Sequence, residues 1–167
     1  MNSLDQLIEK HHANGLLIDT NLLLLYLVGR TNKNRIQTFK RTQQYTIEDF
    51  DLLLNLIFHF TTLITTPHVL SELSNLATLH GAEFSRLRTL FKETVEQTKE
   101  LYDESRFVVS DVDFNRLGLA DAAIASVCSR SLLVLTGDLE LYSALTTRGF
   151  DAINFNHVRA LGWNRPT

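Results

Sequence analysis

The sequence has little of what marks membrane proteins, disulfide-rich proteins and repetitive proteins. It contains one cysteine, Cys128, which excludes an internal disulfide, and two prolines, which leave no proline-rich linker. The longest apolar run, Leu22 to Val28, has seven residues and is too short to cross a bilayer. The polar start MNSLDQLIEKHH lacks the apolar core of a signal peptide. We therefore expect a cytoplasmic protein with no membrane contact, in which residues 1–167 form a single globular domain.

The chain also lacks an overall positive charge. Its formal net charge is −3 and its sequence pI is about 6.0, unlike a protein that coats nucleic acid. One tract, RTNKNRIQTFKR at residues 30–41, is nevertheless basic and holds no acid. It predicts either a solvated, mobile loop or a local phosphate-binding patch. In the second case the residues that contact RNA are Arg30, Lys33, Arg35, Lys40 and Arg41.

Short apolar stretches alternate with longer helical patterns along the chain. Strands are expected at 15–19, 62–66, 106–110, 132–136 and 152–155. Helices are expected at 20–29, 47–60, 67–79, 82–104, 119–130 and 138–148, with a long loop at 31–45. This alternation predicts parallel strands joined by helical crossovers. The expected fold is therefore α/β, with a parallel sheet sandwiched between helices in three layers.

Four acids fall at comparable places in this pattern. Asp19 ends the first expected strand and Asp138 follows the fourth, while Glu72 and Asp121 lie early in helices, on the same stripes as apolar residues. Because ligands of open parallel sheets collect beyond the carboxyl ends of the strands, we expect these four acids to meet there. Any one of them alone is better explained as a helix cap or a surface charge. Four at one edge instead favour a functional site.

Carboxylates that converge repel one another, and a divalent cation neutralises them. Oxygen-only ligation suits Mg²⁺ or Mn²⁺, whereas the six scattered histidines do not have the close spacing of a zinc site. Acidic clusters that hold Mg²⁺ are typical of phosphoryl chemistry. A phosphodiester substrate would also explain why a basic tract accompanies an acidic site.

The same residues resemble the PIN-domain ribonucleases. The resemblance rests on a hydrophobic strand ending in DTN at Asp19, the helical glutamate of VLSEL at Glu72, LADAAIA at Asp121, and LLVLTGD at Asp138, in the family's order over residues 15–156. It implies a Mg²⁺- or Mn²⁺-dependent endoribonuclease. In that pattern the four acids hold the metal ion and its waters and carry out catalysis, and Asn21 and Thr136 orient them by hydrogen bonds.

Several alternatives stay open. The chain is similar to small VapC-type toxins but carries a basic insertion of roughly fifteen residues after its first expected helix, so an antitoxin partner is one possibility. A haloacid dehalogenase needs an acid where Asn21 stands, and a receiver domain needs paired acids that LLVLTGD does not offer. The strongest rival is a catalytically silent PIN scaffold that binds RNA or a protein. Helix 47–60 is more apolar than one buried stripe requires, so it is either fully buried or part of a homodimer interface.

Overall fold

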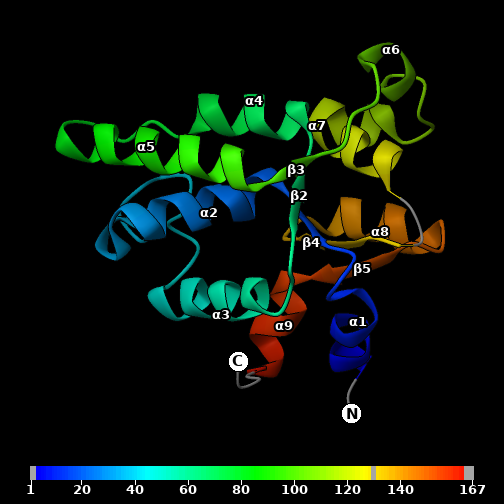
Figure 1. Ribbon diagram of the computed structural model, residues 1–167, viewed down its shortest axis with the longest axis horizontal. Coiled ribbons are helices and arrows are strands. Elements are labelled where there is room, and N and C mark those ends of the chain that lie inside the picture. Colours follow the sequence, from blue (N-terminus) through cyan, green and yellow to red (C-terminus); the bar gives the residue numbers. More distant parts are fainter. Residues whose placement is uncertain (1–2, 129–130, 164–167) are drawn as a thin grey trace.

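The computed structural model describes residues 3–128 and 131–163, in which a parallel sheet is flanked by helices (Figure 1). The strands in these ranges are β1 Leu16–Ile18, β2 Leu63–Thr65, β3 Lys99–Glu100, β4 Leu133–Thr136 and β5 Asp151–Asn154. The helices are α1 Ser3–His11, α2 Thr20–Thr31, α3 Ile47–Phe58, α4 Pro67–Leu76, α5 Ala82–Gln97, α6 Ser105–Val108, α7 Phe114–Val127, α8 Leu139–Thr147 and α9 Phe155–Leu161, with a 3-10 turn, η1, at Lys33–Arg35. The predicted three-layer α/β/α fold is confirmed.

The order of the strands decides where a site can form. The sheet has the order β3-β2-β1-β4-β5, and all neighbouring strands are parallel. The chain adds β2 and β3 on one side of β1, and then crosses over to add β4 and β5 on the other side. The direction of winding therefore reverses between β1 and β4. In open α/β sheets the crevice beyond the carboxyl ends of two such strands is the usual ligand site.

The core is built around β1, β4 and α2. Both strands are buried along their whole length, which explains why they read as continuous apolar runs and not as alternating ones. Helix α2 is also buried on nearly all sides, because it contacts α3, α4 and α5. At Gly29 the helix passes so close to α3 that an added Cβ would lie 2.3 Å from the ring of Phe50. Only glycine permits this approach.

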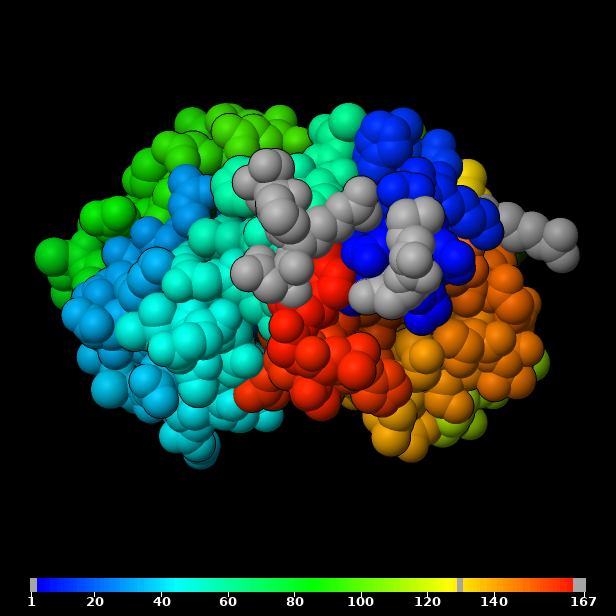
Figure 2. Space-filling model, turned by 90° about the horizontal axis from the view of Figure 1, so that it is seen from below, coloured from blue at the N-terminus to red at the C-terminus, as the bar shows by residue number. Residues whose placement is uncertain are grey.

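Two helices at the ends of the described chain, α1 and α9, were not predicted. They lie side by side at one end of the molecule (Figure 1), and α9, in red, lies between α3 in cyan and α1 with α8 (Figure 2). The indole of Trp163 donates to Asp5 of α1 at 3.1 Å, and the Arg159 guanidinium donates to Asp49 of α3 at 2.7 Å. Helix α9 and the residue that follows it by two positions, Trp163, thus connect α3 and α1, which are distant from them in the sequence.

The prediction of the third strand is wrong. Residues 106–110 form helix α6 and the turn after it, and the third strand is instead β3, inside the region predicted as helix 82–104. The apolar residues of this stretch predicted a buried strand, but Phe107 and Val109 are exposed and only Val108 is buried. Strand β3 is a two-residue exposed edge strand, which has no apolar alternation to detect. The other predicted elements are present, with ends shifted by up to seven residues, the largest shift being at the end of helix 82–104. Residues 129–130 of helix 119–130 lie outside the described residues.

In the described ranges no helix is both long enough and apolar enough to span a membrane.

Candidate active site

Asp19 lies at the junction of β1 and α2, at the point where the winding of the sheet reverses. Its side chain is buried, and its Oδ1 caps α2 by accepting the N–H of Leu22 at 2.9 Å. Its Oδ2 accepts the hydroxyl of Thr136 at 2.5 Å and the backbone N–H of Gly137 at 2.8 Å. Burial raises the pKa of this carboxyl and outweighs the three hydrogen bonds, which lower it. Asp19 therefore connects the carboxyl ends of β1 and β4.

Asp138 follows β4 and caps α8. Its Oδ1 accepts the N–H groups of Glu140 at 2.6 Å and of Leu141 at 3.1 Å, while its own N–H donates to the Thr136 hydroxyl at 2.9 Å. A side-chain cap of this kind satisfies helix N–H groups that have no partner within the helix. Because only Oδ1 is used in the cap, Oδ2 is left for a ligand.

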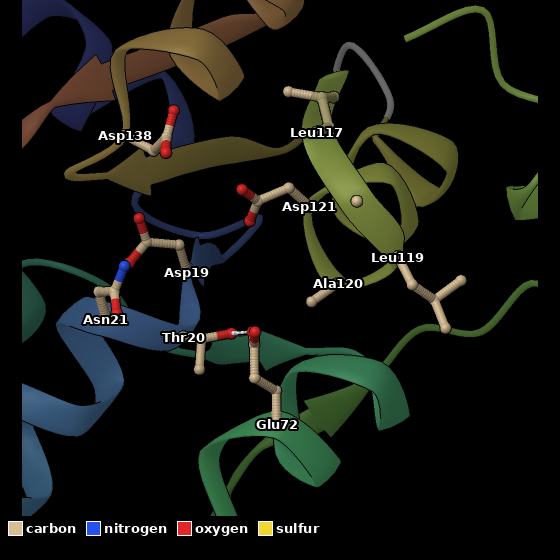
Figure 3. Close-up of a pocket in the computed structure, with 10 residues that line it drawn as sticks. Asp19, Thr20, Asn21, Glu72, Leu117, Leu119, Ala120, Asp121 and Asp138 are labelled. Carbon is tan, nitrogen blue, oxygen red and sulfur yellow. Dashed lines mark hydrogen bonds between the residues drawn. The ribbon is translucent and has the colours of Figure 1, made fainter. Parts of the chain in front are cut away.

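Glu72 reaches the site from α4 and is more exposed than its place on an apolar stripe predicts. Its Oε2 accepts the hydroxyl of Thr20, the first residue of α2, at 2.7 Å (Figure 3). Thr20 was not among the predicted site residues. Its position directly after Asp19 was the only signal in the sequence, and pairing with a residue fifty-two positions away cannot be read from the sequence.

Asp121 comes from α7, which is divided by a kink. Gly118 has φ 76° and ψ 178°, a conformation that residues with a side chain rarely adopt, and it separates a first turn from the helix that carries Asp121. The apolar neighbours Ile124, Ala125 and Cys128 are buried, and the Asp121 side chain projects from α7 toward the space between Asp19 and Asp138 (Figure 3). No hydrogen bond engages its carboxylate within the part of the chain that the structure describes.

The four acids line one pocket. Its walls are Asp19, Thr20, Asn21, Glu72, Leu117, Gly118, Leu119, Ala120, Asp121 and Asp138. Burial, together with the negative charges of the other three acids, raises the pKa of Asp121 to about 7. The acids are thus close enough to repel one another.

These side chains fit a hard divalent cation by donor type, but they do not form a closed ligand set. In residues 3–128 and 131–163, no group of three or more His, Cys, Asp and Glu side chains is arranged to hold a metal ion as it stands. The acids instead surround the pocket from different elements (Figure 3). Mg²⁺ commonly keeps several of its waters and binds one or two carboxylates directly, so an open arrangement of oxygen donors suits it.

Of the two residues predicted to orient the acids, the structure brings one into contact with them. Thr136 is buried and bonds both to Asp19 and to the backbone of Asp138. Asn21 lines the pocket, but its side chain is exposed and, among the described residues, no hydrogen bond joins it to an acid. Glu140, next to the site in sequence, is exposed and pairs with Arg116 at 2.8 Å.

The five predicted RNA-contacting residues divide into two groups. Arg30 stacks on the ring of Tyr26 and donates to its hydroxyl at 2.7 Å. Lys33 pairs with Asp51 at 2.6 Å, and Arg35 pairs with Glu83 at 3.0 Å. Lys40 and Arg41 are exposed, and within the described ranges their side chains form no ion pair or hydrogen bond. The basic tract is therefore partly neutralised by acids of α3 and α5.

A second residue that the sequence prediction missed is Tyr45. Its buried hydroxyl lies over Gly137, so that a Cβ on that glycine would be 3.1 Å from it. Burial, with a further contribution from the charge of Asp19, raises the pKa of Tyr45 to about 12. Tyr45 thereby joins the segment after the basic tract to the loop between β4 and α8.

No protein-family model matches the chain, and no curated protein matches it in sequence.

Proposed function

We propose that this protein is a metal-dependent endoribonuclease that hydrolyses RNA phosphodiester bonds. The observation that carries the proposal is the convergence of Asp19, Glu72, Asp121 and Asp138 on one pocket at the reversal point of the sheet. A structural role explains the caps formed by Asp19 and Asp138. It does not explain Asp121, a half-buried acid without a hydrogen bond in the described chain.

The four carboxylates would hold Mg²⁺ or Mn²⁺ through the oxygens that their hydrogen bonds leave available. A bound cation of this type supplies Lewis acidity, which activates water for attack on phosphorus and offsets the charge that develops on the phosphate. Three hydrogen bonds fix the Asp19 carboxylate in one orientation, and Thr20 fixes that of Glu72. Asp121, which has no such bond, is the acid best able to accept a proton from the attacking water.

The remaining partner assignments stay predictions. Sequence patterns alone indicate an antitoxin partner or a homodimer, and they alone indicate a cytoplasmic location. A catalytically silent scaffold is the competing function, and the experiment below separates it from a nuclease.

The test is cleavage of a labelled single-stranded RNA in Mn²⁺, with EDTA as the metal-free arm. We expect cleavage only in Mn²⁺, and its loss in Asp19→Asn and Asp121→Asn, since the amide keeps the shape of the side chain but removes its charge. Glu140→Gln is the matched control, because that acid is near the site but pairs with Arg116. Circular dichroism checks the fold of each variant. Full activity in folded Asp121→Asn, or no metal-dependent cleavage by the wild type, would contradict the proposal.

A further inference from the structure

A second pocket borders the acidic one. It is lined by Asn21, Phe39, Lys40, Arg41, Leu76 and Thr78, and Asn21 lines both pockets. We propose that this second pocket, called the basic pocket below, binds the nucleotide next to the scissile phosphate of a single-stranded RNA. The inference rests on the proposed function. It adds the substrate class, single-stranded RNA, and the side from which the strand reaches the acidic pocket.

The distribution of charge is the first argument. Three of the five cations between residues 30 and 41 already have partners, in Tyr26, Asp51 and Glu83. The two that have none among the described residues, Lys40 and Arg41, are the two that line the basic pocket. A pair of uncompensated cations beside four acids suits a polyanion whose backbone continues past the metal-binding position.

The segment that carries these cations is held in place. Ile36 and Thr42 are fully buried, and the Thr42 hydroxyl donates to the carbonyl of Ile36 at 2.8 Å. The ring of Tyr45 packs against Phe155 and under the Arg159 guanidinium. Buried or packed anchors of this kind therefore lie on both sides of Lys40 and Arg41. The backbone that carries the two charges is therefore held at the rim of the pocket, which lowers the entropic cost of binding.

The chemistry of the other walls favours an unpaired base. Phe39 and Leu76 are half-buried and present apolar surface to the pocket, while Thr78 adds a polar group. A base of a single strand can stack on an aromatic side chain, whereas the bases of a duplex are already stacked on one another. The exposed Asn21 amide, at the boundary of the two pockets, offers both a donor and an acceptor to the strand as it passes.

The experiment measures binding of a short fluorescent single-stranded RNA to the wild-type chain in EDTA, as a function of salt. Lys40→Gln/Arg41→Gln is compared with Lys33→Gln/Arg35→Gln, which changes the net charge equally but removes cations that are already paired. We expect the first variant to reduce the log–log salt slope by about 1.4, or about 0.7 for each phosphate that the variant no longer neutralises. The control should keep the wild-type slope. Equal slopes in both variants would overturn the proposal.

Two further comparisons test the base and the strand. Phe39→Leu, which keeps apolar volume, should weaken binding about three- to ten-fold by removing the aromatic face. The control is Phe58→Leu, on an exposed residue of α3 that does not line the pocket. The same RNA annealed to its complement should bind more weakly than the single strand. Tighter binding of the duplex, or no binding of either RNA, would contradict the inference.

The outcomes distinguish this inference from the proposed function. One outcome is that the salt slope changes as expected while the wild type never cleaves RNA in Mn²⁺. That result would support the basic pocket as an RNA-binding site and contradict the nuclease proposal. If the wild type cleaves RNA while both double variants bind it equally well, the nuclease proposal is supported and the role of the basic pocket in RNA binding is contradicted.

Discussion

The hydroxyl of Thr136 donates to Oδ2 of Asp19 at 2.5 Å, and so joins the end of β4 to the end of β1. The same hydroxyl oxygen accepts the N–H of Asp138 at 2.9 Å. One buried side chain therefore positions two of the four acids in the pocket. It acts at the point where the strand order reverses.

We expect Thr136→Val to destabilise the protein by about 1–3 kcal/mol, because it leaves a buried carboxylate with one partner fewer. Thr65→Val is a matched control at the end of β2. The Thr65 hydroxyl is buried and, in the described residues, has no hydrogen-bond partner, so its removal should leave stability unchanged or raise it. Urea unfolding of the two variants measures the difference. Equal losses would show that the bond to Asp19 contributes little.

Asp121→Asn should stabilise the metal-free protein, although it removes a site residue. Burial and the other three acids both disfavour the ionised form of this carboxyl, so a neutral amide relieves the repulsion. We expect a gain of about 1–2 kcal/mol at pH 7.5 in EDTA. Thermal melts would detect it, with Glu93→Gln, an exposed acid of α5, as the control. A lower melting temperature for Asp121→Asn would contradict the crowding of charges.

Added Mn²⁺ should reverse that order of stability. A cation that binds only the folded wild type stabilises it by about 2.7 kcal/mol at a hundred times the dissociation constant. Asp121→Asn should gain much less, so the melting curves of the two proteins converge or cross as Mn²⁺ increases at constant ionic strength. Equal gains in both proteins would exclude Asp121 from a metal site.

Gly118→Ala should lower both stability and RNA cleavage. Among the described residues, apart from the chain neighbours and the backbone of the same helix, no atom lies within 4 Å of an added Cβ at this position. The cost is therefore backbone strain of about 1–3 kcal/mol at φ 76°. Gly81→Ala is the control, since Gly81 also has positive φ and open space but does not line the acidic pocket. We expect both variants to lose a similar amount of stability. Only Gly118→Ala should cleave RNA more slowly, because only Gly118 forms the kink that presents Asp121. Equal cleavage rates in the two variants would show that the kink at Gly118 is not needed for activity.

Arg148→Gln should make stability less dependent on pH. The guanidinium donates to both oxygens of Asp111, at 2.8 and 2.6 Å, and holds the pKa of that carboxyl below its usual value. Such a group stabilises the fold above the pKa of the unfolded chain, and this contribution disappears as pH falls through the lower folded value.

The variant should therefore melt about 2–6 °C below wild type at pH 7, with the difference shrinking below about pH 4. Melts at pH 7, 5 and 3 measure it, and the control is Arg106→Gln, whose partner Glu104 is an exposed neighbour. A difference that is the same at all three pH values would refute this assignment.

The sequence by itself determined the elements whose signal is local. Strands β1, β2 and β4 are mostly apolar, and β5 has an apolar centre. The helices that follow β1, β2 and β4 begin at the side-chain caps Asp19, Thr66 and Asp138. Helix caps and hydrophobic periodicity act within a few residues, so they can be read from the chain. The same signals predicted that acids follow β1 and β4.

Only the tertiary structure decided how the distant parts are paired. The edge strand β3 forms because its backbone completes the sheet beside β2, and its two exposed residues carry no pattern of their own. The hydrogen bond between Thr20 and Glu72 joins the first residue of α2 to the middle of α4. Likewise, acids on α3 and α5 neutralise Lys33 and Arg35 and leave Lys40 and Arg41 without such partners in the described chain. Charge pairing depends on distance in space, and a sequence records only distance along the chain.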